Sequence, residues 1–180
     1  DLEFAWMNRF VVQPGAEWIS AIEAVWGRTY PDLPARVVLW SDPDGDGNPS
    51  DAQVLITVET VSQKIDNPGD NRNVIPIPPT YIGPAGTSFF VGVNFVDVYG
   101  SACFIALDVD EPISAEGWYA YNTTGLLDLN NLSASVLSEW NFANFLVRAV
   151  GFEGAMTNDC NANGIIDACD ISSGLSEDSN

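Results

Sequence analysis

The sequence contains no histidine and few basic residues. Its 180 residues include 6 Lys+Arg against 25 Asp+Glu, for a formal net charge of −19. Without histidine the chain cannot build Ser-His-Asp or Cys-His catalytic groups, nor the usual zinc sites that use imidazole. Because so negative a surface is repelled by phosphate backbones and anionic membranes, we expect no nucleic-acid or membrane partner.

Long apolar runs are also missing. No stretch approaches the roughly 18 apolar residues that a membrane span requires, and no charged-then-apolar signal segment precedes Asp1. We therefore expect a mature, exported chain. Lys64 is the only lysine, and two of the three cysteines lie in an acidic segment, which suits an oxidising, calcium-rich extracellular or cell-surface setting. The third, Cys103, lies in an apolar stretch and is expected to be a buried thiol.

Hydrophobic residues make up 46% of the chain and charged residues 17%, a composition typical of a packed globular core. Apolar residues alternate with polar ones in short segments separated by Pro and Gly turns, a pattern of β-strands. It predicts an all-β fold, a β-sandwich of the jelly-roll type. Residues 133–139 lack helix breakers and admit one short helix. The expected strands are residues 4–12, 18–26, 36–40, 53–61, 73–77, 88–96, 102–107, 117–121 and 144–150.

The composition changes near the C-terminus. Beyond residue 153 the chain consists mainly of small, acidic and amide residues without aromatics, so it cannot build a hydrophobic core of its own. We therefore divide the chain into a β-sandwich domain, residues 1–153, and an appended tail, residues 154–180.

The tail contains a segment with the spacing of a calcium loop. Oxygen-bearing side chains occupy loop positions 1, 3, 5, 9 and 12, Gly164 stands at position 6, and position 7 offers a backbone carbonyl. Cys160 and Cys169 fall between ligand positions, where a disulfide could close the ring. Position 12 is aspartate rather than glutamate, so bidentate ligation is less assured. The predicted ligands are Asp159, Asn161, Asn163, Ile165, Asp167 and Asp170. The alternative is a solvated acidic tail.

A second acidic loop follows the strand expected at residues 36–40. It repeats the Asp-x-Asp-x-Asp-Gly pattern at Asp42, Asp44 and Asp46, and its later acid is Asp51. Asp51, the Asn48 carbonyl or water would complete a calcium site here. The alternative is a polar turn between strands.

These motifs carry a resemblance. The string Asp167-Ala168-Cys169-Asp170, preceded by Asp159-x-Asn161-x-Asn163-Gly164, resembles the calcium repeats of thrombospondin type 3 and the first loop of dockerins. It looks most like the tandem tail repeats of secreted bacterial surface proteins. The body, with its Asp-Gly-Asp-Gly loop and apolar strands, is similar to jelly-roll accessory domains of exported bacterial proteins. The resemblance of the body implies a noncatalytic role. A dockerin's second loop and helices have no counterpart, so we expect no cohesin binding.

Three functions remain open from the sequence. The first is a calcium-stabilised structural or adhesive subunit that associates with itself, as a filament or a closed oligomer, or with another surface protein. The second is a calcium-dependent carbohydrate-binding module. Its glycan would stack on some of the six tryptophans, although these are more often core residues. The third is a hydrolase, but no carboxylate pair is singled out. The group Asp108, Asp110 and Glu111 reads equally as a solvated turn or a further cation site. We expect no enzyme.

Overall fold

The computed structural model describes residues 2–27, 33–62, 72–97, 105–109, 117–122 and 125–151. Strands and two 3₁₀ turns (η) make up the regular structure of these residues. The elements are β1 (Leu2–Val11), β2 (Trp18–Val25), β3 (Pro34–Ser41), η1 (Pro49–Asp51), β4 (Gln53–Val61), β5 (Arg72–Tyr81), β6 (Ser88–Asp97), β7 (Leu107–Asp108), β8 (Gly117–Asn122), η2 (Leu132–Ala134), β9 (Val136–Trp140), β10 (Asn144–Phe145) and β11 (Val147–Gly151).

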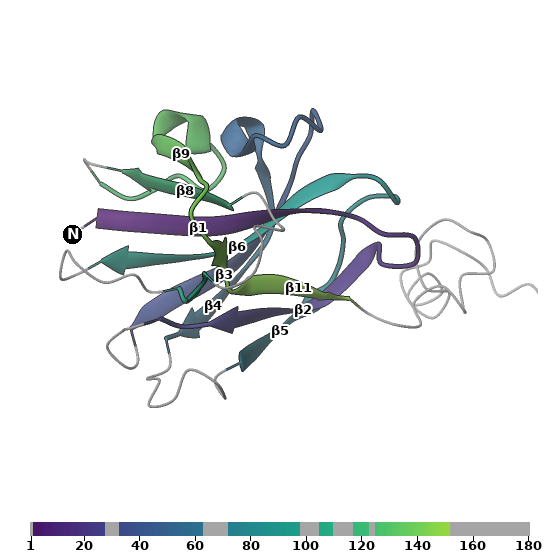
Figure 1. Cartoon of the computed structure of the whole chain (residues 1–180), viewed down its shortest axis with the longest axis horizontal. Helices are drawn as coiled ribbons and strands as arrows, with labels where there is room; N and C mark the ends of the chain where they lie inside the picture. Colours follow the sequence, from purple (N-terminus) through teal and green to yellow (C-terminus); the bar gives the residue numbers. More distant parts are fainter. Residues whose placement is uncertain are drawn as a thin grey trace, which may run out of the picture.

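The strands form two unequal layers. Six antiparallel strands make the larger sheet in the order β4-β3-β6-β1-β8-β9, and three make the smaller sheet in the order β11-β2-β5. Figure 1 shows β11, β2 and β5 together below β1 and β8. The short β7 and β10 pair with each other, and Trp26 bridges to Ile105. The all-β sandwich expected from the sequence is therefore confirmed.

The period-two pattern of the strands explains the core between the layers. On β1, Phe4, Trp6 and Phe10 pack into the cluster shared with the smaller sheet, whereas Ala5 and Met7 belong to a second cluster on the opposite face. Successive side chains of a strand point to opposite faces, so a strand with apolar residues on both faces predicts burial on both. The larger sheet is accordingly covered on two sides.

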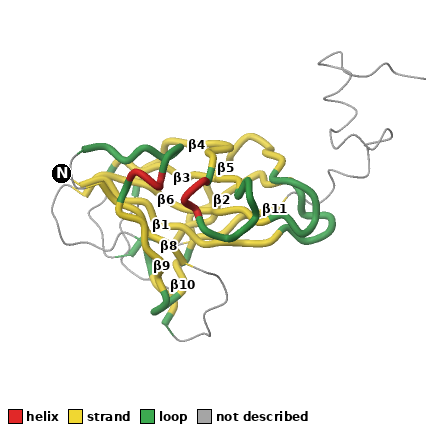
Figure 2. Tube along the Cα trace, turned by 90° about the horizontal axis from the view of Figure 1, so that it is seen from above, coloured by secondary structure: helices red, strands yellow, loops and turns green. Residues whose placement is uncertain are grey.

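A loop and the two 3₁₀ turns cover the outer face of the larger sheet. Leu127, Leu129 and Leu132 pack there against Trp40 and Phe90. The Trp40 indole N–H donates to the Leu129 carbonyl oxygen at 2.9 Å, so the buried ring fixes the covering segment by a hydrogen bond. Figures 1 and 2 show η1 and η2 side by side over this face.

One buried amide ties the layers together. Asn8 is buried on β1, and its Nδ2 donates to the carbonyl oxygens of Phe145 at 2.6 Å and of Val147 at 3.0 Å. These carbonyls belong to β10 and β11. These two hydrogen bonds offset part of the cost of burying the amide, whose Oδ1 is buried without a hydrogen-bond partner among the described residues.

Two sequence expectations need correction. The segment expected to admit a helix forms η2 and then the strand β9, which pairs antiparallel with β8 from Tyr121↔Val136 to Gly117↔Trp140. Pairing with β8 and the packing of Leu137 and Trp140 outweigh a local helix preference. Of the strand expected at residues 102–107, residues 102–104 lie outside the described part of the chain. The described remainder is not one continuous strand: it forms the Ile105 bridge and the first residue of β7, Leu107.

Candidate metal centre

Two groups of ligands were expected from the sequence, and the structure describes one of them. The tail ligands Asp159, Asn161, Asn163, Ile165, Asp167 and Asp170, together with Cys160 and Cys169, lie outside the described residues. The loop from residue 42 to residue 51 is described throughout. It connects β3 to β4 and ends in η1.

Asp42 organises the start of this loop. Its side chain is buried, with 4% exposure. The Gly45 N–H donates to Asp42 Oδ1 at 3.2 Å, and the Gly47 N–H donates to Oδ2 at 3.0 Å. Two backbone donors on one carboxylate hold the chain in a tight curve, because short acidic side chains replace the missing backbone partners of a turn.

The following acids continue the curve in steps of two residues. The Asp46 N–H donates to Asp44 Oδ1 at 3.0 Å, the Asn48 N–H donates to Asp46 Oδ1 at 2.7 Å, and the Ser50 N–H donates to Asn48 Oδ1 at 3.0 Å. Asn48 thereby caps η1, whose first residue is Pro49. The alternating oxygen side chains therefore set the path that returns the chain to Asp51.

The glycines of the motif allow this path. Gly45 has φ +73° and Gly47 has φ +82°, values that side-chain-bearing residues adopt only with strain. Gly47 is also pressed against β1, because a Cβ there would lie 2.6 Å from Arg9 Cζ. Arg9 Nε donates to Ser88 Oγ at 2.8 Å, which fixes the guanidinium beneath the loop. No local pattern in the sequence predicts this contact between distant segments.

The loop brings three of its five predicted ligands together. Carboxylate oxygens of Asp42, Asp44 and Asp51 all lie within 4.8 Å of one another. Asp46 is not part of this group. The Asn48 side chain caps η1, and its carbonyl, the ligand atom expected from the sequence, stays a prediction. The Asp51 contribution depends on η1, which folds the end of the loop back toward its start.

Asp51 has an unusual environment for a carboxylate. Its Oδ1 is buried and has no hydrogen-bond partner among the described residues. Burial, followed by repulsion from the Asp44 carboxylate, raises the pKa of Asp51 above the ordinary value of 3.8. Both features fit a divalent cation, because a cation supplies the missing partner and removes the repulsion. Calcium prefers carboxylate and carbonyl oxygens, which this loop offers.

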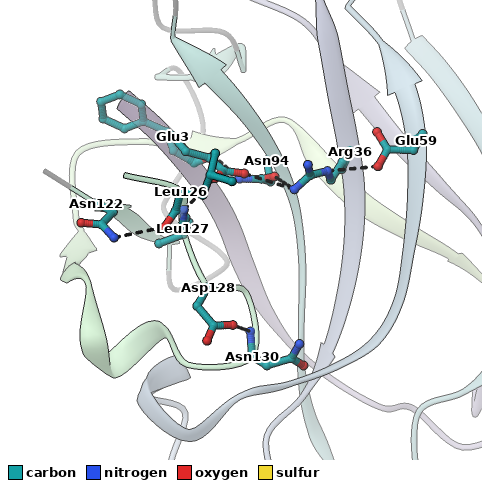
Figure 3. Close-up of polar contacts among 10 residues, drawn as sticks. Glu3, Arg36, Glu59, Asn94, Asn122, Leu126, Leu127, Asp128 and Asn130 are labelled. Atoms are coloured by element: carbon teal, nitrogen blue, oxygen red, sulfur yellow. Dashed lines mark hydrogen bonds and ion pairs between the residues drawn. The ribbon is translucent and has the colours of Figure 1, made fainter. Parts of the chain in front are cut away.

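A second polar group lies on the same sheet, around Arg36 of β3. Arg36 Nη1 donates to Glu3 Oε1 at 3.1 Å and to Asn94 Oδ1 at 3.2 Å, and Arg36 Nε donates to Glu59 Oε1 at 3.1 Å (Figure 3). The other oxygen of the buried Glu3 accepts the Leu127 N–H at 2.6 Å. This network anchors the covering segment to the sheet.

A cavity of about 50 Å³ adjoins Arg36, Glu59 and Asn94. Organic ligands generally occupy pockets of about 300 Å³ or more. The cavity is therefore the size of bound water rather than of a substrate.

The tryptophans are placed mainly as core residues. Trp6, Trp26 and Trp40 are buried, and the other three are half-buried. The most exposed aromatic residue among the described residues is Phe142, with 81% exposure. Its ring makes an edge contact with the Trp140 ring, with 5.5 Å between the ring centroids. Trp140 packs on the core between the sheets, whereas the acidic loop adjoins the outer cover. The aromatic pair and the acidic loop thus belong to different faces of the larger sheet.

Comparison of the chain with protein-family models, with curated proteins and with solved structures gave no match. Among the described residues, no helix has the length and apolar character needed to cross a membrane. The chemistry of the site itself therefore has to support any functional conclusion.

Proposed function

We propose that this chain is a non-enzymatic structural or adhesive subunit that works outside the cell or at its surface. In this proposal calcium binds the loop between β3 and β4, and the protein associates with copies of itself or with another surface protein. The observation that supports it best is the group of Asp42, Asp44 and Asp51 carboxylates, whose oxygens lie within 4.8 Å of one another.

The charge of the whole chain supports the same function. A protein with a net charge of −19 opposes close packing of identical copies, and bound divalent ions reduce that repulsion. Calcium at the loop would also join the end of β3 to η1, directly before β4. A ligand that binds only the folded state adds about 2.7 kcal/mol of stability at one hundred times its Kd. The expected tail site, Asp159 to Asp170, would bind further calcium.

Calcium titration of the full chain by calorimetry and by thermal unfolding tests the loop site. We expect Asp44→Asn to remove one class of binding sites and part of the calcium-dependent rise in Tm. Glu139→Gln is the matched control, because it removes one negative charge at an exposed position of β9, outside the loop. Equal calcium responses of the two variants would exclude the loop as a site.

Electron microscopy of the full chain, in calcium and after chelation, tests the structural role. Ordered assemblies that disappear on chelation would support it. Monodisperse monomers under both conditions would remove it.

A calcium-dependent carbohydrate-binding module is the second candidate. It is favoured by the exposed Phe142 ring beside Trp140, since aromatic faces bind sugar rings. It is disfavoured by the burial or half-burial of all six indoles. A glycan array with the wild-type chain and Phe142→Ala decides between the two functions, because only the carbohydrate-binding module predicts hits that the substitution abolishes.

A further inference from the structure

The two sheets leave four described strands with one open edge each, and three of these edges are protected. An open edge presents unpaired backbone N–H and C=O groups to any other strand. On β5, Pro76, Pro78 and Pro79 remove backbone donors, and a register irregularity interrupts its pairing with β2. Both β9 and β11 have only five residues. Short strands, prolines and irregular pairing are the common protections against strand addition.

The fourth edge, β4, lacks these protections over most of its length. It has nine residues without proline, and within the described sheet it pairs with β3 alone. One irregularity occurs near its start, at Leu55, after which the pairing with β3 is regular. The Val54 N–H is bonded to Asn130 Oδ1 at 3.3 Å, at the same end. The stretch from residue 56 to residue 61 is therefore a regular edge.

β4 is also poor in charge. Glu59 is its one charged residue, and it is paired with Arg36 at 3.1 Å (Figure 3). The rest of the strand is apolar or neutral in a chain whose net charge is −19. A second copy can therefore approach this edge without bringing unpaired negative charges together.

We propose that β4 pairs antiparallel with β4 of a second copy, about a two-fold axis at Val58. This inference rests on the self-association in the proposed function and assigns its interface. In this register Ile56 of one copy lies opposite Thr60 of the other, and Thr57 lies opposite Glu59, all within the regular stretch. At its end, the irregular Leu55 comes next to Val61 of the other copy. Leu55 and Val61 are both exposed in the single chain. Pairing covers each with an apolar neighbour, and cross-strand pairs of this kind stabilise sheets.

The neighbouring registers are less favourable. An axis at Thr57 would place Leu55 opposite the charged Glu59. An axis at Glu59 would place the two Glu59 carboxylates opposite each other, which destabilises a sheet. Shifting the pairing by a single residue would turn the core-facing side chains of one strand toward the other face. The Val58 axis avoids all three conflicts.

Such a contact joins two six-stranded sheets into one continuous sheet. Because both copies use the same strand, the contact is isologous and closes at a dimer. A filament of this protein would need another contact in addition to β4.

Introducing a negative or a positive charge at Thr57 tests the interface and its register. In the full chain with calcium, we expect Thr57→Asp to weaken dimerisation about threefold to thirtyfold, because two new like-charge pairs with Glu59 form across the axis. We expect Thr57→Lys to tighten it, because the same positions become ion pairs. Val74→Asp and Val74→Lys are the controls: they make the same charge changes at an exposed position, 56% exposed, on the proline-protected β5. Sedimentation equilibrium measures the dimer constant, and thermal unfolding verifies that each variant is folded.

The outcomes separate this inference from the proposed function. If the wild-type chain self-associates and each Thr57 variant dimerises as tightly as its Val74 control, the β4 interface is overturned. The structural role is then retained. Weakening by both aspartate and lysine would overturn the Val58 register. Wild-type chain that stays monomeric with and without calcium would overturn the proposed self-association itself.

Discussion

The surroundings of Asp51 disfavour the negative charge of its carboxylate. Burial and the nearby Asp44 carboxylate raise the pKa of Asp51. A group whose pKa is higher in the folded than in the unfolded state binds more protons when folded. Its contribution to stability is therefore lost as the pH rises through the folded pKa.

Substitution of Asp51 is expected to have opposite effects with and without calcium. In a chelator at pH 7, Asp51→Asn should raise the free energy of unfolding, because it removes the disfavoured charge. In excess calcium it should lower that free energy relative to wild type, because a ligand oxygen is lost. Urea unfolding in both conditions measures the difference. Loss of stability in chelator would contradict this account.

The pH dependence supplies a second measurement of the same residue. In chelator, the advantage of Asp51→Asn should shrink as the pH falls through the raised pKa of the folded carboxyl, and vanish once the pH is well below the ordinary value of 3.8. The comparison is made between the two proteins at each pH, so that the titration of the other carboxylates cancels. An advantage that is independent of pH would exclude Asp51 ionisation as its cause.

The two glycines of the loop should respond differently to alanine. Gly45→Ala costs about 1 to 2 kcal/mol, the strain of a positive φ. Gly47→Ala has the same strain and in addition displaces Arg9 from its hydrogen bond with Ser88, worth about 1 kcal/mol more. We expect the larger loss of stability, and the larger loss of calcium affinity, at Gly47. Denaturant unfolding and calorimetry measure the two effects, and equal costs would show that the Arg9 contact contributes nothing.

At the scale of the elements, the covering segment converts the outer face of the larger sheet into a second core. Leu132 is fully buried there, with 0% exposure, whereas Leu126 of the same segment is 75% exposed. Both residues are leucines within a few positions of each other. They therefore offer a matched pair for measuring what the cover contributes.

Leu132→Ala should lower the free energy of unfolding by about 2 to 5 kcal/mol, the usual cost of a buried leucine. Leu126→Ala should change it by less than about 0.5 kcal/mol, as an exposed substitution does. Chemical denaturation of both variants tests the difference. Similar small costs would mean that the segment adds little to the stability of the sheet.

The strands and the loop motif were predictable because their causes are local. Alternating residues such as Val54, Ile56 and Val58 give the bounds of β4 as the structure has them, and the Asp-x-Asp-x-Asp-Gly spacing located the acidic loop. The contact of Gly47 with Arg9 and the bond of Trp40 to Leu129 join residues far apart in sequence. Periodicity carries no information about such pairs.

The strand β9 is a second feature that local sequence did not predict. The segment from Ser133 to Glu139 contains no residue that prohibits a helix, so local propensity left its structure open. Pairing with β8 decided it. Tertiary contacts frequently override weak local preferences in this way.

At the scale of the whole molecule, the excess of acidic residues opposes the proposed contact between copies. The net charge of −19 acts over distances set by the ionic strength, about 30 Å at 0.01 M and about 8 Å at 0.15 M. The proposed β4 contact is nearly free of charge, so salt should act on the approach of the copies rather than on the contact itself.

Dimerisation of the calcium-free protein should therefore strengthen as sodium chloride is raised from about 0.01 M to 0.15 M, since the long-range repulsion is screened over that range. An interface made of ion pairs would respond in the opposite direction and weaken. Sedimentation equilibrium in chelator across the series distinguishes the two.

Calcium added at constant ionic strength should strengthen dimerisation beyond the effect of sodium, because ions bound at the Asp42, Asp44 and Asp51 group reduce the charge of each copy itself. Magnesium at the same concentration should do less, because it requires a stricter octahedral geometry and releases its water reluctantly. Equal effects of both divalent ions would indicate general screening and would contradict a specific calcium site.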